Sequence, residues 1–207
     1  MCDEDTVIES NSYLAQESKM GRRDFNKLAV GAAAILMLPP VANALEVVGH
    51  DVMVNTPDGD ADCYFVHPAK GKHPGVIIWP DILGLRPAFR LMGERLAKSG
   101  YSVLVVNPYY RSARSPVIEP GASFQDAETR NMVMPYYSAL SAETNVTDAK
   151  AYVSYLDAQN SVDVKRKIGT TGYCMGGPMV MRTAAAIPER IGAGGSFHGG
   201  GLVTNDA

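Results

Sequence analysis

Residues 167–186 read KIGTTGYCMGGPMVMRTAAA, and this stretch places a cysteine between a predicted strand and a predicted helix. The residues up to Thr171 have the pattern of a short strand, and those from Pro178 onward have the spacing of a helix. Small residues stand two positions before and two positions after Cys174, which is the spacing of a nucleophile elbow. Unpaired N–H groups and the helix dipole at such a helix start favour thiolate over thiol. The competing interpretation is a buried structural cysteine beside a glycine-rich turn.

Extended and helical segments alternate along the rest of the chain. Strands are predicted at residues 47–54, 61–66, 75–79, 102–106, 167–171 and 191–197, and helices at 87–99, 145–159 and 178–186. The first two strands flank the turn sequence Thr-Pro-Asp-Gly and are therefore expected to form a hairpin. The apolar runs at 75–79 and 102–106 are typical of strands buried on both faces of a parallel sheet. The sequence predicts the α/β class, with a mostly parallel sheet and flanking helices.

One segment, residues 108–135, is rich in Pro, Ser, Arg and Asn and is predicted to be irregular. It follows the end of a predicted strand, and long excursions at strand ends are where open parallel sheets bind ligands. Aromatic side chains that either line such a pocket or pack in the core are Trp79, Tyr109, Tyr110, Tyr136 and Tyr137.

Composition excludes several classes of protein. The 207 residues are 46% hydrophobic and 20% charged, the profile of one ordinary globular domain. The 19 Lys and Arg against 22 Asp and Glu give a net charge of -3, which provides no basic surface for nucleic acid. The three cysteines are scattered and form no Cys-x-x-Cys sequence, which argues against a metal site. The sequence also lacks a dinucleotide-binding motif, which argues against a redox cofactor. Cys63 is expected to be a small core residue.

Residues 1–44 are predicted to be an export signal. Arg22-Arg23, with Phe25 and Lys27 after it, resembles a twin-arginine signal, and small residues precede a cleavage point after Ala44. The apolar run at 28–38 is shorter than the about 20 residues that a membrane-spanning helix needs. The expected partner is the twin-arginine translocase, and the expected location is periplasmic or secreted. The hydrolase-like domain then comprises residues 45–207.

Several motifs in the right order make the chain resemble the dienelactone hydrolase family of α/β-hydrolases. They are Gly-Tyr-Cys-Met-Gly-Gly at 172–177, Trp-Pro-Asp-Ile-Leu-Gly-Leu at 79–85, Asn-Pro-Tyr-Tyr-Arg at 107–111 and Ser-Phe-His-Gly-Gly at 196–200. The resemblance implies an α/β-hydrolase fold and a carboxymethylenebutenolidase-type hydrolysis of lactones or small carboxylic esters. It also implies a covalent acyl-enzyme, with neither metal nor organic cofactor.

The resemblance implies a role for each matching residue. Cys174 attacks the carbonyl, and the N–H groups of Met175 and Ile82 form the oxyanion hole. A carboxylate at the position of Asp81 holds the resting cysteine, and Arg111 helps to bind a substrate carboxylate. From the residues alone, the alternative for Asp81 is a helix or turn cap after a strand, and the alternative for Arg111 is a solvated loop charge beside Arg114.

The acid and base that should follow the nucleophile are not evident. After Cys174 the only histidine is His198 and the only aspartate is Asp206, and His198 comes too early in the fold to be the expected base. His198 is expected to be a pocket residue or a hydrogen bonder at the strand end, and Tyr110 is expected to line the pocket. The resemblance implies a C-terminally truncated hydrolase that lacks the last strands, with the missing acid and base beyond residue 207, and a monomer when complete. The alternative is an exported, non-catalytic module that binds a small carboxylate.

Overall fold

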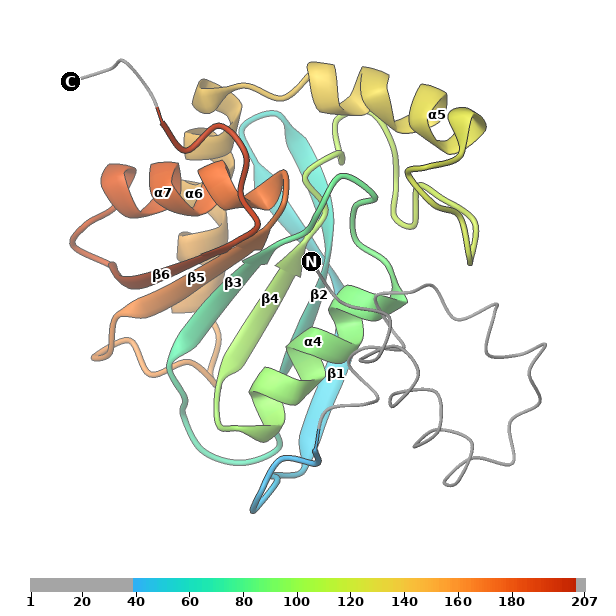
Figure 1. Ribbon diagram of the computed structural model, residues 1–207. Coiled ribbons are helices and arrows are strands. Elements are labelled where there is room, and N and C mark those ends of the chain that lie inside the picture. The colour runs from blue at the N-terminus through green and yellow to red at the C-terminus, as the bar shows by residue number, and fades with distance from the viewer. Residues whose placement is uncertain (1–38, 204–207) are drawn as a thin grey trace, which may run out of the picture.

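The computed structural model describes residues 39–203, which form one mixed sheet with helices on both faces (Figure 1). The strands are β1 Val47–Thr56, β2 Gly59–Pro68, β3 Gly75–Trp79, β4 Ser102–Val106, β5 Ile168–Tyr173 and β6 Ile191–Phe197. The helices are α4 Pro87–Lys98, α5 Ala127–Ser138, α6 Ala142–Asp157 and α7 Gly176–Ala186. The α/β class predicted from the sequence is confirmed.

The sheet is mixed because its first two strands run against the others. β1 and β2 form the predicted hairpin, and β2 pairs antiparallel with β4. β3 pairs parallel with β4 and with β5, and β5 pairs parallel with β6. Each predicted strand is present, so that only the exact bounds differ from expectation.

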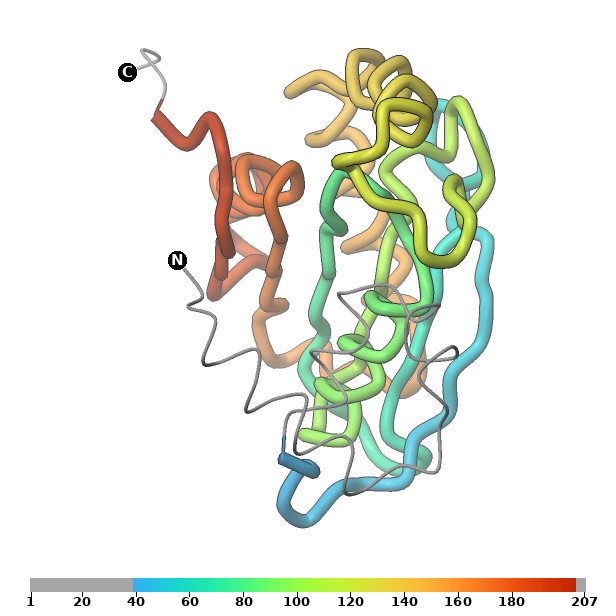
Figure 2. Tube along the Cα trace, turned by 45° about the vertical axis from the view of Figure 1, so that its right-hand side comes forward, coloured from blue at the N-terminus to red at the C-terminus, as the bar shows by residue number. Residues whose placement is uncertain are grey.

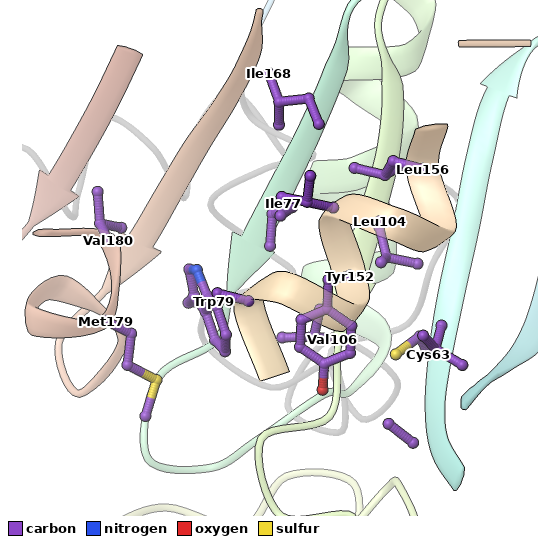
Figure 3. Packing of buried hydrophobic residues seen from close by; sticks show 14 of the residues in the cluster. Cys63, Ile77, Trp79, Leu104, Val106, Tyr152, Leu156, Ile168, Met179 and Val180 are labelled. Carbon is purple, nitrogen blue, oxygen red and sulfur yellow. The ribbon is translucent and has the colours of Figure 1, made fainter. Parts of the chain in front are cut away.

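Two hydrophobic cores lie on the two faces of the sheet, because successive side chains of a strand point to opposite faces. Ile77 and Leu104 belong to the core that also contains residues of α6 and α7, whereas Val76 belongs to the core beneath α4. Figure 3 shows Trp79 at the end of β3 beside Tyr152 of α6, with ring centroids 5.6 Å apart. Burial on both faces explains why β3 and β4 are continuous apolar runs in the sequence.

The prediction that residues 108–135 are irregular is wrong at their C-terminal end, where α5 begins at Ala127. The helix contains Pro135, whose nitrogen carries no hydrogen to donate, and it buries only Thr129 and Val133. A helix with so small an apolar face has no strong periodicity in its sequence.

The start of α6 also differs from the prediction, since the helix begins at Ala142 rather than at residue 145. The Ser141 hydroxyl accepts a hydrogen bond from the Thr144 N–H, and the Thr144 hydroxyl accepts one from the Ser141 N–H. This reciprocal cap satisfies backbone donors that the first helical turn leaves without partners. A Ser-x-x-Thr sequence was the signal that marks this start.

The strand order reverses at β3, and this reversal positions the candidate site. From β3 the chain crosses to β4 on one side, and it later returns to β5 on the other side. Open α/β sheets bind ligands in the crevice beyond the carboxyl ends of the strands at such a reversal. Figure 1 and Figure 2 both place α5 beyond those strand ends.

The described residues cover only the end of the predicted export signal. Apart from its last positions, 39–44, the predicted export signal lies outside the described residues. Across residues 39–203, the length and apolar character of every helix fall short of what a membrane crossing requires.

Candidate active site

Cys174 sits on a sharp turn between β5 and α7, with a backbone φ of 51° that side-chain-bearing residues rarely adopt. A Cβ on Gly172 would lie 2.2 Å from the carbonyl oxygen of Gly176, and a Cβ on Gly176 would lie 2.3 Å from that of Trp79. Neither position therefore has room for a side chain. The local pattern predicted this elbow, and the strained φ is the backbone conformation that lifts a nucleophile out of the sheet.

A cavity of about 640 Å³ opens beside Cys174. Its walls come from the loop after β3, the helices α5 and α6, the start of α7, and the segment after β6. The lining residues are Ile82, Phe124, Met134, Tyr137, Ser138, Leu140, Ser141, Ala142, Cys174, Met175, Pro178, Met179, Arg182, Gly200 and Gly201. The cavity is thus mainly apolar, as ligand pockets usually are, and the half-buried free thiol lies at its wall.

The structure brings Ile82 and Met175 to the same cavity as Cys174, as expected for donors of an oxyanion hole. Met175 directly precedes α7, at a position where backbone N–H groups have no partner within the helix. Ile82 lies in the loop after β3, and the side chain of Tyr109 contacts it there. The Tyr109 hydroxyl donates to the Ile82 carbonyl oxygen at 2.8 Å, and it also lies 3.0 Å from the Met175 sulfur.

Tyr109 is therefore the residue that connects the two predicted oxyanion donors. Its side chain is almost completely buried, and burial raises the pKa of its hydroxyl well above the usual value. The hydroxyl consequently keeps its proton and remains a donor throughout the neutral range. The sequence marked Tyr109 only as an aromatic residue of the pocket or core, because its contact with Ile82 spans 27 positions of the chain.

Asp81 is engaged within its own loop. Its carboxylate accepts two hydrogen bonds from the Arg86 guanidinium, at 2.6 and 2.8 Å, and one from the Leu83 N–H at 3.0 Å. These contacts match the turn-cap alternative for Asp81. The hydrogen bonds from Arg86 and from the Leu83 N–H hold the loop that carries Ile82 in one conformation. Asp81 and Arg86 therefore stabilise that loop.

Arg111 lies away from the cavity walls, in a polar network that joins the buried Asp148 to the exposed Asp58. Its guanidinium donates to Asp148 at 2.7 and 2.9 Å and to Asp58 at 2.6 and 3.0 Å. The Tyr110 hydroxyl bonds Asp148 at 2.8 Å and Thr56 at 2.7 Å. The structure therefore does not bring Arg111 or Tyr110 into the cavity, and their expected contact with a ligand gives way to a structural network.

Replacement of Arg111 by methionine is expected to destabilise the fold by about 3 kcal/mol, because it leaves the buried Asp148 carboxylate without its cation. Burial already raises the pKa of Asp148, and the hydrogen bonds from Arg111 and Tyr110 oppose that rise. In the variant the pKa of Asp148 rises further, so its carboxyl takes up a proton as the pH falls. The difference in stability between the variant and the parent protein then shrinks. Thermal melts from pH 7 down to pH 5 measure this. A deficit that grows toward pH 5 would contradict the assignment.

His198 follows β6 with a backbone φ of 55° and an exposed side chain. It is not among the residues that line the cavity, whereas Gly200 and Gly201 just after it are. Cys63, by contrast, lies in the core with 2% of its surface exposed, as predicted, and burial raises the pKa of its thiol. The two thiols thus differ sharply in access to solvent.

Sequence comparison identifies relatives of the chain. A model of the dienelactone hydrolase family matches residues 61–207. The chain is 29% identical over 137 residues to a carboxymethylenebutenolidase of Pseudomonas putida, covering 65% of this chain and 54% of that one. It is 25% identical over 123 residues to a carboxymethylenebutenolidase of Rhodococcus opacus, covering 59% of this chain and 43% of that one. The chain thus spans about half the length of the curated relatives it matches.

Solved structures show the same architecture. A dienelactone hydrolase-like promiscuous phosphotriesterase from metagenomic libraries superposes with a TM-score of 0.59 at 23% identity, covering 75% of this chain and 60% of that one. Dienelactone hydrolase from Anabaena variabilis superposes with a TM-score of 0.55 at 16% identity, covering 74% of this chain and 64% of that one. These likenesses support the fold, and the family match covers most of the sequence. The chain therefore belongs to the dienelactone hydrolase family.

Proposed function

We propose that the protein hydrolyses lactones or small carboxylic esters, of the carboxymethylenebutenolide type, with Cys174 as the nucleophile. The observation that carries this proposal is the position of Cys174 on a strained elbow that opens into a cavity shared with Ile82 and Met175. The names of the curated relatives support the substrate class. The mainly apolar walls suit a small organic ester.

In the proposed mechanism, the Cys174 thiolate adds to the ester carbonyl carbon, and the carbonyl oxygen becomes an oxyanion. The N–H groups of Met175 and Ile82 stabilise that negative charge as it forms. The carbon–oxygen bond then breaks, the leaving oxygen takes a proton from solvent water, and a thioester on Cys174 remains; an ester releases its alcohol, whereas a lactone keeps it on the acyl chain. Water hydrolyses the thioester to the carboxylic acid and regenerates the thiol.

Tyr109→Phe is expected to lower kcat by about tenfold with little change in KM. The variant removes the hydrogen bond to the Ile82 carbonyl oxygen, so the Ile82 N–H is no longer held in its direction toward the oxyanion. The oxyanion forms only after Cys174 attacks the ester, so kcat falls while KM changes little. Steady-state kinetics with p-nitrophenyl acetate measure the effect. Tyr101→Phe, on an exposed tyrosine remote from the cavity, is the control. Equal kcat in both variants would show that Tyr109 does not position the oxyanion hole.

The proposed function is tested by alkylation of the native full-length protein with iodoacetamide. Exposed thiolates react and buried thiols do not, so Cys174 is expected to be labelled while Cys63 stays unlabelled until the protein is denatured. Loss of ester and lactone hydrolysis should track labelling of Cys174 one for one. Full activity after complete labelling of Cys174 would rule out this nucleophile.

A second function, binding of a small carboxylate without turnover, has one observation in its favour. Among the cavity-lining residues in the described part of the chain, no histidine or acid is present to act as base. This function predicts ligand binding that survives Cys174→Ala, with no hydrolysis at any pH.

Export through the twin-arginine translocase remains a proposal supported by the Arg22-Arg23 sequence and the small residues before Ala44. It places the protein in the periplasm or outside the cell. N-terminal sequencing of the protein from its source tests it, with Leu45 as the expected first residue.

A further inference from the structure

Two histidines outside the candidate active site lie side by side on the hairpin of β1 and β2. His50 belongs to β1 and His67 to β2, and the register pairs His50 with Phe65 and His67 with Val48. Because alternate residues of a strand share a face, the two histidines are diagonal neighbours on one face of the hairpin. Their ring centroids are 6.4 Å apart, and the two ring planes are perpendicular.

An ion in solution can reach both imidazoles. The His50 side chain is exposed, and that of His67 is half buried. The buried Phe65 ring lies next to both, with its centroid 6.0 Å from that of His50 and 5.2 Å from that of His67. Tyr155 of α6 packs edge-on against Phe65 at 5.7 Å. The aromatic rings beneath the pair therefore keep the two imidazoles at the surface.

The Pro68 carbonyl oxygen determines which ring nitrogen of His67 is free. It lies 2.8 Å from Nδ1 of His67. A carbonyl oxygen can only accept, so Nδ1 carries the hydrogen and Nε2 keeps a lone pair. Histidines that bind metal ions usually donate their other ring N–H in this way, which orients the ring and raises the basicity of the ligating nitrogen.

The other two of the four histidines lack this arrangement. Nδ1 of His73 lies 3.2 Å from the Gly100 carbonyl oxygen, and its Nε2 lies 2.9 Å from that of Lys70, so backbone groups engage both nitrogens. His198 is exposed and follows β6, the strand at the edge of the sheet opposite β1. His198 therefore serves as a single-histidine control.

We propose that His50 and His67 together bind a divalent transition-metal ion such as Zn²⁺, Ni²⁺ or Cu²⁺, for which imidazole is a preferred ligand. Metal–nitrogen bonds of about 2.0 Å place the centres of two imidazoles that share an ion about 5 to 6 Å apart. A small rotation about the soft terminal torsions of the two side chains closes the remaining distance. Across residues 39–203, no group of three or more His, Cys, Asp or Glu side chains is placed to hold a metal ion. Water supplies the other ligands of this pair, and the ion binds reversibly.

The bound ion acts as a clip across the edge of the sheet, where β1 pairs with β2 alone. An ion that binds the folded hairpin and not the separated strands stabilises the fold. Figure 1 shows that β1 begins at the end of the sheet opposite α5, so the pair lies far from the crevice beside Cys174. The clip is therefore independent of the proposed hydrolase function, and His50→Gln and His67→Gln should hydrolyse esters at the rate of the parent protein.

The test counts the imidazole ligands of Cu²⁺ bound to the native full-length protein by electron spin-echo envelope modulation. Cys174 is first alkylated with iodoacetamide, so that its thiol does not compete for the ion. We expect two imidazoles in the native protein and in His198→Gln, and one in His50→Gln and in His67→Gln. The affinity for Cu²⁺ should fall by about tenfold or more in each of the latter two variants, since one of the two protein ligands is lost.

A second measurement tests the clip by thermal melts of the same alkylated proteins. Saturating Ni²⁺ is expected to raise the Tm of the native protein and of His198→Gln by about 5 °C, and to leave His50→Gln and His67→Gln unchanged. Mg²⁺, which prefers oxygen ligands, should shift none of them. A single imidazole on Cu²⁺ in the native protein, or equal Ni²⁺ shifts in all three variants, overturns the site.

Discussion

Cys174→Ala is expected to lower kcat/KM for ester hydrolysis by at least about a thousandfold, because Cys174 provides the only thiol in the cavity walls of the described chain. The side chain is only half buried and makes no structural bridge, so the variant should keep the thermal stability of the parent. Initial rates with p-nitrophenyl acetate, together with a thermal melt, measure both properties.

Cys63→Ala is the matched control for that experiment. Cys63 is buried in the core, so its replacement should cost stability through a small cavity and leave the activity per folded molecule unchanged. The opposite pattern, with activity lost in Cys63→Ala and kept in Cys174→Ala, would contradict the assignment of the nucleophile.

Gly172→Ala is expected to destabilise the fold by about 3 kcal/mol, which corresponds to a Tm lower by about 10 °C in a chain of this size. The new Cβ would lie 2.2 Å from the Gly176 carbonyl oxygen and 2.5 Å from its carbonyl carbon, and both are backbone atoms that cannot rotate away. The elbow must therefore shift. A nucleophile displaced by about 1 Å loses about a hundredfold in rate, so activity should fall even in the fraction that folds.

Gly169→Ala, in the same strand, provides the control for Gly172→Ala. A Cβ on Gly169 would meet the Val76 side chain at 3.7 Å, an ordinary van der Waals contact. This variant should melt within a few degrees of the parent and keep its activity. Similar melting temperatures for the two variants would show that the elbow is looser than the structure indicates.

Local sequence patterns predicted the parts of the fold that depend on neighbouring residues. The elbow around Cys174 needs only small residues at two fixed positions, and the buried strands β3 and β4 need only continuous apolar runs. The helix α5 escaped prediction because Pro135 and a small apolar face remove the usual signs of a helix.

Long-range contacts decided the roles that the sequence could not assign. Arg111 pairs with Asp148, 37 positions away, and a motif around Arg111 carries no information about that partner. The cavity beside Cys174 could not be predicted either, because its walls come from α5, α6 and α7, which lie far apart in the sequence.

Whether Cys174 carries the acyl group during turnover can be measured by mass spectrometry of the full-length protein, quenched in acid shortly after mixing with p-nitrophenyl acetate. We expect the peptide containing Cys174 to gain the mass of one acetyl group and the peptide containing Cys63 to gain none. The adduct should disappear as the substrate is exhausted. Hydrolysis that proceeds with no acyl group on Cys174 at any quench time would contradict this expectation.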